Sequence, residues 1–217
     1  MRVAVIGGTG TIGSEVVRLM SPRHEVLVCA RTTGDFPVDI TSADSIIRLF
    51  EVVGPIDAVV CAAGEAMFKP LLDMSDEDIA LGLRSKLMGQ VNLVRIGQRY
   101  VRDRGSFTLT GGATARNPIP GSVGYGLANA ALEGFVRGAA LDLPRGIRIN
   151  AVSPQWVDVS LLQYGMDPAW GVPVATVARG YVASVEGSWT GTVIDAGWHD
   201  RGESLSIGLP EAAATHG

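Results

Sequence analysis

The chain has 217 residues, 47% of them hydrophobic, so it is long enough for one domain with a full core and too apolar to be disordered. The net charge of −4, with no basic block, argues against nucleic acid as the main partner. No apolar run reaches the roughly 20 residues of a membrane helix, and an expected core strand at the N-terminus argues against a signal peptide. Cys29 and Cys61 fall in predicted buried strands and the three histidines lie far apart, so we predict a cytoplasmic protein with reduced thiols and no metal site.

The first thirteen residues carry the strongest local pattern. Residues 2–6 form an apolar run with β-branched residues, which predicts a buried strand, and residues 14–20 predict the start of a helix. Between them lies a glycine-rich turn, which lets the backbone approach a pyrophosphate while the helix N-terminus offers unpaired N–H donors. The alternative is a plain strand-to-helix turn. The candidate cofactor-binding residues of this turn are Gly7, Thr9, Gly10, Thr11, Ile12 and Gly13.

Apolar strand runs then alternate with helical stretches, which indicates a parallel sheet covered on both faces. Further strands are predicted at residues 26–30, 36–40, 56–61, 106–110, 147–152 and 192–196. Helices are predicted at residues 43–53, 76–101, 123–143 and 174–185. We therefore expect an α/β fold, a Rossmann-type doubly wound parallel sheet of about seven strands, as a single domain over residues 1–197. Residues 198–217 are a predicted C-terminal tail.

The end of the second strand indicates the choice of cofactor. In such folds an acidic residue there pairs with the ribose 2′-hydroxyl of NAD, whereas an arginine accommodates the 2′-phosphate of NADP. Here Ala30 occupies the expected acidic position and Arg31 follows it, so NADP(H) is favoured over NAD(H). The alternative is that Arg31 is an ordinary solvated surface charge.

Asp39 and Ile40, at the end of the third predicted strand, are expected where the adenine ring lies. Asp39 is alternatively only the turn residue before the next helix. The cap of that helix is then Thr41 or Ser42, because short hydroxyl side chains accept from the first backbone N–H groups of a helix.

With these features the chain resembles the short-chain dehydrogenase/reductase family over about residues 1–197. The strings that carry the resemblance are GGTGTIG at 7–13, Asp39-Ile40, CAAG at 61–64, YGLAN at 125–129, RINAVSP at 148–154 and TGTVIDAG at 190–197. The resemblance implies a Rossmann fold, an oxidoreductase activity and further cofactor contacts. Val157 falls where the backbone contacts the nicotinamide carboxamide. The implied contacts beyond the glycine turn are Ala62, Ala63, Gly64, Pro154 and Val157.

The active-site positions depart from the family pattern. Its Tyr-x-x-x-Lys motif, in which the tyrosine exchanges a proton with the substrate and the lysine lowers the tyrosine pKa, corresponds to Tyr125 and Asn129. The serine of the family falls on Gly112. An asparagine of the preceding long helix falls on Lys86, so lysine and asparagine are exchanged. We hypothesise that Lys86 supplies the positive charge from the opposite helix; the alternatives are that Lys86 reaches water without a chemical role and that Tyr125 is only a core residue.

The loss of the serine removes one hydroxyl that would polarise a substrate carbonyl, and Thr110 and Thr114 are the nearest replacements. On the substrate side, an apolar and aromatic cluster is expected to line a small pocket, to pack on a partner subunit or to cap the core. This cluster consists of Trp156, Leu161, Leu162, Tyr164, Met166 and Trp170.

These observations predict an NADP(H)-dependent oxidoreductase of short-chain dehydrogenase type that acts on a small carbonyl or alcohol. The catalytic candidates are Tyr125, Lys86 and Asn129. A non-catalytic NADP(H)-binding or regulatory protein is the alternative, favoured by Gly112 and Asn129. The spacing of Gly7, Gly10 and Gly13 is also typical of extended epimerase-like relatives, but those carry a larger C-terminal substrate domain. The resemblance further implies a homodimer or homotetramer formed through the two long helices.

Overall fold

In the computed structural model, residues 1–163, 165 and 167–197 are described, and their seven strands form one parallel sheet. The strand order is β3-β2-β1-β4-β5-β6-β7, so the chain moves outward from β1 in one direction and then from β4 in the other. This arrangement confirms the predicted doubly wound sheet and places a topological switch point between β1 and β4. The strands are β1 (Arg2–Ile6), β2 (Glu25–Ala30), β3 (Phe36–Pro37), β4 (Ile56–Cys61), β5 (Val101–Thr110), β6 (Arg148–Pro154) and β7 (Val193–Ala196).

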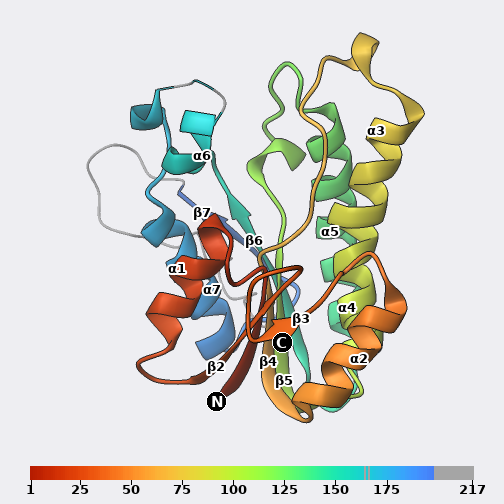
Figure 1. Ribbon diagram of the computed structural model, residues 1–217, viewed down its shortest axis with the longest axis vertical. Coiled ribbons are helices and arrows are strands. Elements are labelled where there is room, and N and C mark those ends of the chain that lie inside the picture. The colour runs from red at the N-terminus through yellow and green to blue at the C-terminus, as the bar shows by residue number, and fades with distance from the viewer. Residues whose placement is uncertain (164, 166, 198–217) are drawn as a thin grey trace, which may run out of the picture.

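Helices cover both faces of the sheet. On one face lie α1 (Thr11–Met20) and α7 (Val174–Glu186); on the other lie α2 (Ala43–Val53), α4 (Gln90–Gly97) and α5 (Val123–Asp142) (Figure 1). The alternation of side chains along β1 supplies both cores, because Val3 and Val5 join the α1/α7 side while Ala4 and Ile6 join the other. Two short helices, α3 (Asp76–Leu81) and α6 (Asp158–Gln163), follow the C-terminal ends of β4 and β6 and rise on either side of that edge of the sheet (Figure 1).

The helix predicted at 76–101 is wrong in its extent and regularity. Its helical part ends at Gly97, and residues 82–89 between α3 and α4 form a π-helix, a wider coil that is frequent at functional sites. Val101 begins β5 instead, where it pairs with Ile56 of β4. The register then shifts between Ile56 and Ala58. The apolar spacing did not separate the two states, because Val101 is buried in the strand as it would be on a helix face.

The strand predicted at 36–40 is also shorter than expected. Only Phe36 and Pro37 pair with β2, because β2 ends at Ala30 and offers no further partner. Val38 and Ile40 are nevertheless buried, which explains their apolar character.

Two other elements begin earlier than predicted. Helix α1 begins at Thr11, three residues before the predicted start, and the strand predicted at 106–110 begins at residue 101.

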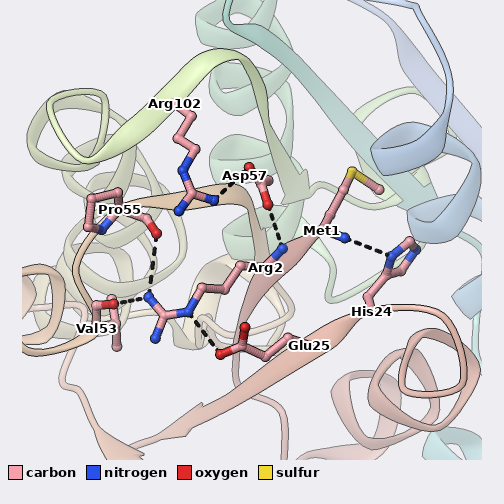
Figure 2. A network of polar contacts seen from close by, with 8 residues as sticks. All are labelled: Met1, Arg2, His24, Glu25, Val53, Pro55, Asp57 and Arg102. Atoms are coloured by element: carbon pink, nitrogen blue, oxygen red, sulfur yellow. Dashed lines mark hydrogen bonds and ion pairs between the residues drawn. The ribbon is translucent and has the colours of Figure 1, made fainter.

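A polar network ties the strands together at the edge of the sheet where β1, β2 and β4 begin (Figure 2). The backbone N–H of Arg2 donates to Asp57 at 2.6 Å, and the same carboxylate pairs with Arg102 at 2.9 Å. The guanidinium of Arg2 pairs with Glu25 at 2.9 Å and donates to the carbonyl of Val53. The network fixes the beginnings of β1, β2, β4 and β5 and the end of α2. The catalytic candidates lie at the opposite edge, where the strands end.

Candidate cofactor and active site

The glycine turn after β1 forms a tight cradle. Gly7 has a φ of +79°, and its N–H donates to the carbonyl of Cys29 at 2.8 Å. A Cβ at Gly13 would lie 2.0 Å from the carbonyl oxygen of Gly7, so only glycine lets α1 pack this closely on the turn. Gly10, the N-cap of α1, gives no side-chain cap, and the first turn of α1 carries no acidic residue. Its first N–H groups therefore lack an intrahelical partner, which fits the pyrophosphate of a dinucleotide.

A cleft of ≈ 310 Å³ runs from this turn past the ends of β2 and β4. It gathers predicted residues from four separate segments of the chain. Those that line it are Gly7, Thr9, Gly10, Arg31, Asp39, Ile40, Ala62, Ala63 and Gly64. Of the remaining turn residues, Ile12 lines the neighbouring cavity, Gly13 is buried beneath the turn and Thr11 is exposed.

Arg31 and Asp39 differ in the partners that hold them at this cleft. Arg31 is exposed and forms an ion pair with Glu65, which lies across the cleft, at 3.3 Å. Asp39 accepts hydrogen bonds from the N–H and hydroxyl of Thr41, at 2.9 and 2.7 Å, and these bonds hold the carboxyl pKa below its usual range. Ser42 caps α2 by accepting from the N–H of Ser45. Asp39 is thus engaged in its own turn, whereas the guanidinium of Arg31 faces solvent and the cleft.

A second cavity of ≈ 430 Å³ adjoins the first, and the two share Ala62, Ala63 and Gly64 as walls. It lies above the ends of β5 and β6 and brings together the three catalytic candidates. The predicted residues that line it are Ile12, Ala62, Ala63, Gly64, Lys86, Tyr125, Asn129, Pro154 and Val157. The glycine turn and the candidate tyrosine thus belong to one continuous depression at the C-terminal edge of the sheet, where such folds bind ligands.

Lys86 is buried at the wall of this cavity, 6% exposed, and does not reach out to water. Its Nζ donates to the carbonyl oxygens of Thr110 and Gly111, at 3.1 and 3.2 Å. Burial lowers the pKa of the amine to about 8, and Cys61 acts weakly in the opposite direction. Among the described residues no carboxylate pairs with it, so backbone carbonyls alone offset the cost of burying the charge.

Gln90, which the sequence did not single out, supports the cavity wall by bonding to two residues that line it. Its Oε1 accepts from the N–H of Thr110 at 2.8 Å, and its Nε2 donates to the carbonyls of Thr110 and Lys86 at 3.0 and 2.8 Å. The last pair between β4 and β5 is Val60 with Thr108, so the backbone of Thr110 needs a side chain as partner. The sequence signal that could have identified Gln90 was its spacing from Lys86, because residues four apart lie on the same helix face.

The side chain of Asn129 fills the space that a side chain at position 112 would need. A Cβ at Gly112 would lie 2.5 Å from Nδ2 of Asn129, so the asparagine amide stands where a side chain at 112 would point. Nδ2 of Asn129 donates to the hydroxyl oxygen of Thr114 at 3.0 Å. Its Oδ1 is buried and has no hydrogen-bond partner among the described residues. The two departures from the family pattern are therefore sterically coupled, and they leave an acceptor at the wall of the cavity.

The hydroxyl of Thr110 bonds to core groups and to none of the three catalytic candidates. It bonds to the carbonyl of Cys61 and, at 2.6 Å, to the phenol of Tyr181, a fully buried residue of α7. Burial raises the pKa of Tyr181 well above its usual range, although the bond to Thr110 opposes the shift. Thr110 thus lines the cavity, but its hydroxyl is engaged by these two core partners, whereas the hydroxyl of Thr114 bonds to Asn129 at the cavity wall.

The four described members of the predicted apolar cluster on the substrate side differ in burial. Trp156 lines the cavity and packs edge-on against Phe68, with ring centroids 5.4 Å apart. Leu161 is buried, whereas Leu162 and Trp170 are exposed. Tyr164 and Met166 lie outside the described residues, as does the predicted tail at 198–217.

Within the described part of the chain, no group of three or more His, Cys, Asp or Glu side chains converges as metal ligands would. No helix there is both long and apolar enough to cross a membrane. Cys29 and Cys61 are both buried, and burial raises the pKa of the Cys61 thiol to about 11.

The fold and the uncapped glycine turn define a class, the doubly wound dinucleotide-binding proteins. Comparison with known proteins is more specific. A family model described as enoyl-(acyl carrier protein) reductase matches residues 18–168. The chain belongs to the short-chain dehydrogenase/reductase family, whose members are oxidoreductases.

Several relatives support this membership. The crystal structure of protein lin1944 from Listeria innocua is 41% identical, has a TM-score of 0.86, and aligns over 90% of this chain and 98% of its own. A small-chain dehydrogenase in complex with NADPH is 29% identical, with a TM-score of 0.79 over 90% of this chain and 95% of its own. A hydroxynaphthalene reductase-like protein of Metarhizium brunneum is 29% identical over 75% of this chain, which spans only 66% of that relative.

Proposed function

We propose that this protein is an NADP(H)-dependent oxidoreductase that interconverts a small carbonyl compound and its alcohol. The observation that carries the proposal is the continuous depression joining the Gly7–Gly13 turn, whose helix N-terminus is uncapped, to Tyr125, Lys86 and Asn129. The NADPH complex of a related small-chain dehydrogenase supports a nicotinamide cofactor. The reductase and dehydrogenase names of other relatives support the reaction class.

Arg31 supports the choice of NADP(H). No carboxylate stands at Ala30 to repel a 2′-phosphate, and the guanidinium of Arg31 borders the same cleft. Glu65 competes for this guanidinium, so binding of the phosphate requires Arg31 to exchange one anionic partner for another. A phosphate carries more charge than a carboxylate and accepts a bidentate pair, which favours the exchange.

When bound, the cofactor supplies or accepts the hydride. In the proposed reduction, Tyr125 donates its phenolic proton to the carbonyl oxygen of the substrate and regains a proton from water. Lys86 sits at the wall of the same cavity, and its ammonium contributes positive charge that favours the deprotonated phenol. Because its pKa is about 8, this help weakens as the pH rises through that value.

A second function is favoured by one specific observation. Asn129 and Gly112 fill each other's space, so the cavity has neither a lysine nor a serine at the usual positions. A chain that keeps the cofactor cradle without these groups also fits an NADP(H)-binding protein that transfers no hydride. The two functions share cofactor binding and separate on turnover.

The test begins with equilibrium titration of the purified protein with NADPH and with NADH, followed by nicotinamide fluorescence. We expect tighter binding of NADPH, and an Arg31→Ala variant that loses this preference while it keeps its affinity for NADH. Turnover is then measured with benzaldehyde, cyclohexanone and diacetyl. Tyr125→Phe is expected to abolish turnover. Tyr100→Phe serves as the matched control, because Tyr100 directly precedes β5 at the opposite edge of the sheet. Binding without any turnover favours the second function; no binding of either nucleotide refutes both.

We also propose that the chain forms a homodimer or homotetramer through its long helices. On α5, Leu127 and Leu141 are exposed, and added methyl groups at Gly134 and Gly138 would meet nothing within 4 Å. Small residues of this kind permit close helix packing. Light scattering coupled to gel filtration, repeated on Leu141→Glu, tests the proposal; a monomeric wild-type protein would refute it.

A further inference from the structure

One threonine of the substrate cavity has a hydroxyl that accepts a hydrogen bond from a neighbouring side chain and is still able to donate one. Thr114 lies on the short 3₁₀ turn Ala113–Ala115 and lines the cavity together with Tyr125. Its hydroxyl oxygen accepts from Nδ2 of Asn129 at 3.0 Å. Among the described residues, this hydroxyl accepts that bond and donates none of its own. A hydroxyl that accepts one bond in this way is a better donor for the next.

Contacts with Gly126 and Asn129 pack Thr114 against α5, the helix that carries Tyr125. A Cβ at Gly126, the residue after Tyr125, would lie 3.2 Å from the backbone carbonyl oxygen of Thr114. Asn129 follows Tyr125 by four residues, so both side chains project from one face of α5. The turn that carries Thr114 therefore packs on the face of α5 that carries both Tyr125 and Asn129.

Ion pairs anchor the turn from its other side. Two residues after Thr114, the guanidinium of Arg116 pairs with Asp195 of β7 and, at 3.3 Å, with the buried carboxylate of Glu133 on α5. It also donates to the hydroxyl of Ser153 at 3.3 Å. Thr114 is thus fixed between α5 and the ends of β6 and β7, as a preorganised donor must be.

We propose that Thr114 is a catalytic residue that donates a hydrogen bond to the carbonyl oxygen of the substrate, and that Asn129 positions it. The inference rests on the proposed function and names the group that replaces the missing serine. In the reduction, the carbonyl carbon accepts hydride from NADPH, which leaves NADP⁺, and the C=O π pair moves to oxygen. That oxygen takes the proton of Tyr125, while Thr114 keeps its own proton and stabilises the developing negative charge.

Gly112 contributes to the same arrangement of Asn129 and Thr114. A side chain there would displace the amide of Asn129, because the added Cβ would lie 2.5 Å from Nδ2. Gly112 has an extended backbone with φ of 166°, so nothing but this contact disfavours a larger residue. Glycine at 112 and asparagine at 129 together direct the donor role to Thr114.

The experiment compares Thr114→Val and Thr114→Ser with the wild-type protein. Three quantities are measured for each: the Kd of NADPH, the kcat and KM for the best carbonyl of the panel, and the thermal midpoint. We expect Thr114→Val to lower kcat about 10²-fold with an unchanged Kd for NADPH, and Thr114→Ser to stay within about threefold of wild type. Thr176→Val on α7, away from the cavity, is the control. Gly112→Ala is expected to lower kcat as Thr114→Val does.

Three outcomes overturn the proposal in distinguishable ways. If the wild type turns over and Thr114→Val keeps kcat within about twofold, Thr114 is not the donor, although the proposed function stands. If the wild type binds NADPH but reduces no carbonyl, both fall. Should Thr114→Val fail to fold, Thr114→Ala takes its place, since it removes the hydroxyl with less effect on packing. Equal losses in Thr114→Ser and Thr114→Val would indicate a merely structural role and also overturn the proposal.

Discussion

The buried amine of Lys86 predicts a measurable dependence of stability on pH. In the folded protein its pKa is about 8, lowered from 10.5 because burial removes water from the ammonium group, with a weak opposing effect of Cys61. The unfolded chain holds this proton up to higher pH. Between about pH 8 and pH 10.5 the unfolded chain binds this proton and the folded chain does not. The contribution of Lys86 to the free energy of unfolding is therefore most favourable above about pH 10.5, where the amine is neutral in both states, and it is lost as the pH falls toward 8.

The magnitude follows from the two pKa values. Their difference corresponds to about 3 kcal/mol of unfolding free energy, of which about 2.5 kcal/mol is regained when the pH rises from about 7 to about 10. Lys86→Met keeps most of the side-chain volume and cannot titrate. The unfolding free energy of the wild type minus that of Lys86→Met should therefore rise by about 2.5 kcal/mol over this range.

Urea unfolding of the cofactor-free proteins, followed by tryptophan fluorescence at about pH 7, 8, 9 and 10, measures this difference. Other titrating groups cancel because they are common to both proteins. Arg84→Met removes an exposed positive charge from the same π-helical segment and is the matched control, since a guanidinium stays protonated throughout. A wild-type minus Lys86→Met difference that stays flat with pH would refute the reasoning and mean that Lys86 reaches water.

Three further predictions concern the cradle, the cofactor and the core. Gly13→Ala, whose methyl would lie 2.0 Å from a backbone carbonyl oxygen, should abolish NADPH binding by titration, whereas Gly138→Ala, with open space, should leave it intact; binding by Gly13→Ala would contradict the cradle. Glu65→Gln releases Arg31 and should tighten NADPH binding about two- to fivefold without affecting NADH, and equal effects on both would exclude the competition. Thr110→Val leaves a buried phenol short of its partner and should cost about 1–3 kcal/mol in urea unfolding; no loss would argue against that bond.

Local sequence determined the sheet and the glycine turn after β1. Strands β1 and β4 are covered on both faces, so nearly every residue is apolar and the pattern is visible without tertiary information. The turn at residues 7–13 was equally readable. Gly7 needs a positive φ and Gly13 needs the absence of a Cβ, and both requirements appear directly as glycine.

The ends of several elements depended on packing. The helix predicted to reach residue 101 ends at Gly97, where a Cβ would lie 2.6 Å from the ring of Phe50. Val101 is buried as a strand residue, and its apolar character fitted either state. The third strand stops at Pro37 because β2 offers no partner beyond Ala30.

The chemistry of the site was decided by tertiary contacts. The sequence located Lys86, Asn129 and Gly112 as departures from the family, but not that Lys86 donates to the end of β5, 24 residues away. The sequence also did not separate Thr110 from Thr114, because the hydroxyl of Thr110 bonds to the buried Tyr181 and that of Thr114 bonds to Asn129 at the cavity wall. A residue type fixes which bonds a side chain is able to make. Which ones it makes depends on groups brought close only by the folded chain. That is why the glycine turn was readable from sequence and the contacts of Lys86, Asn129 and Thr114 were not.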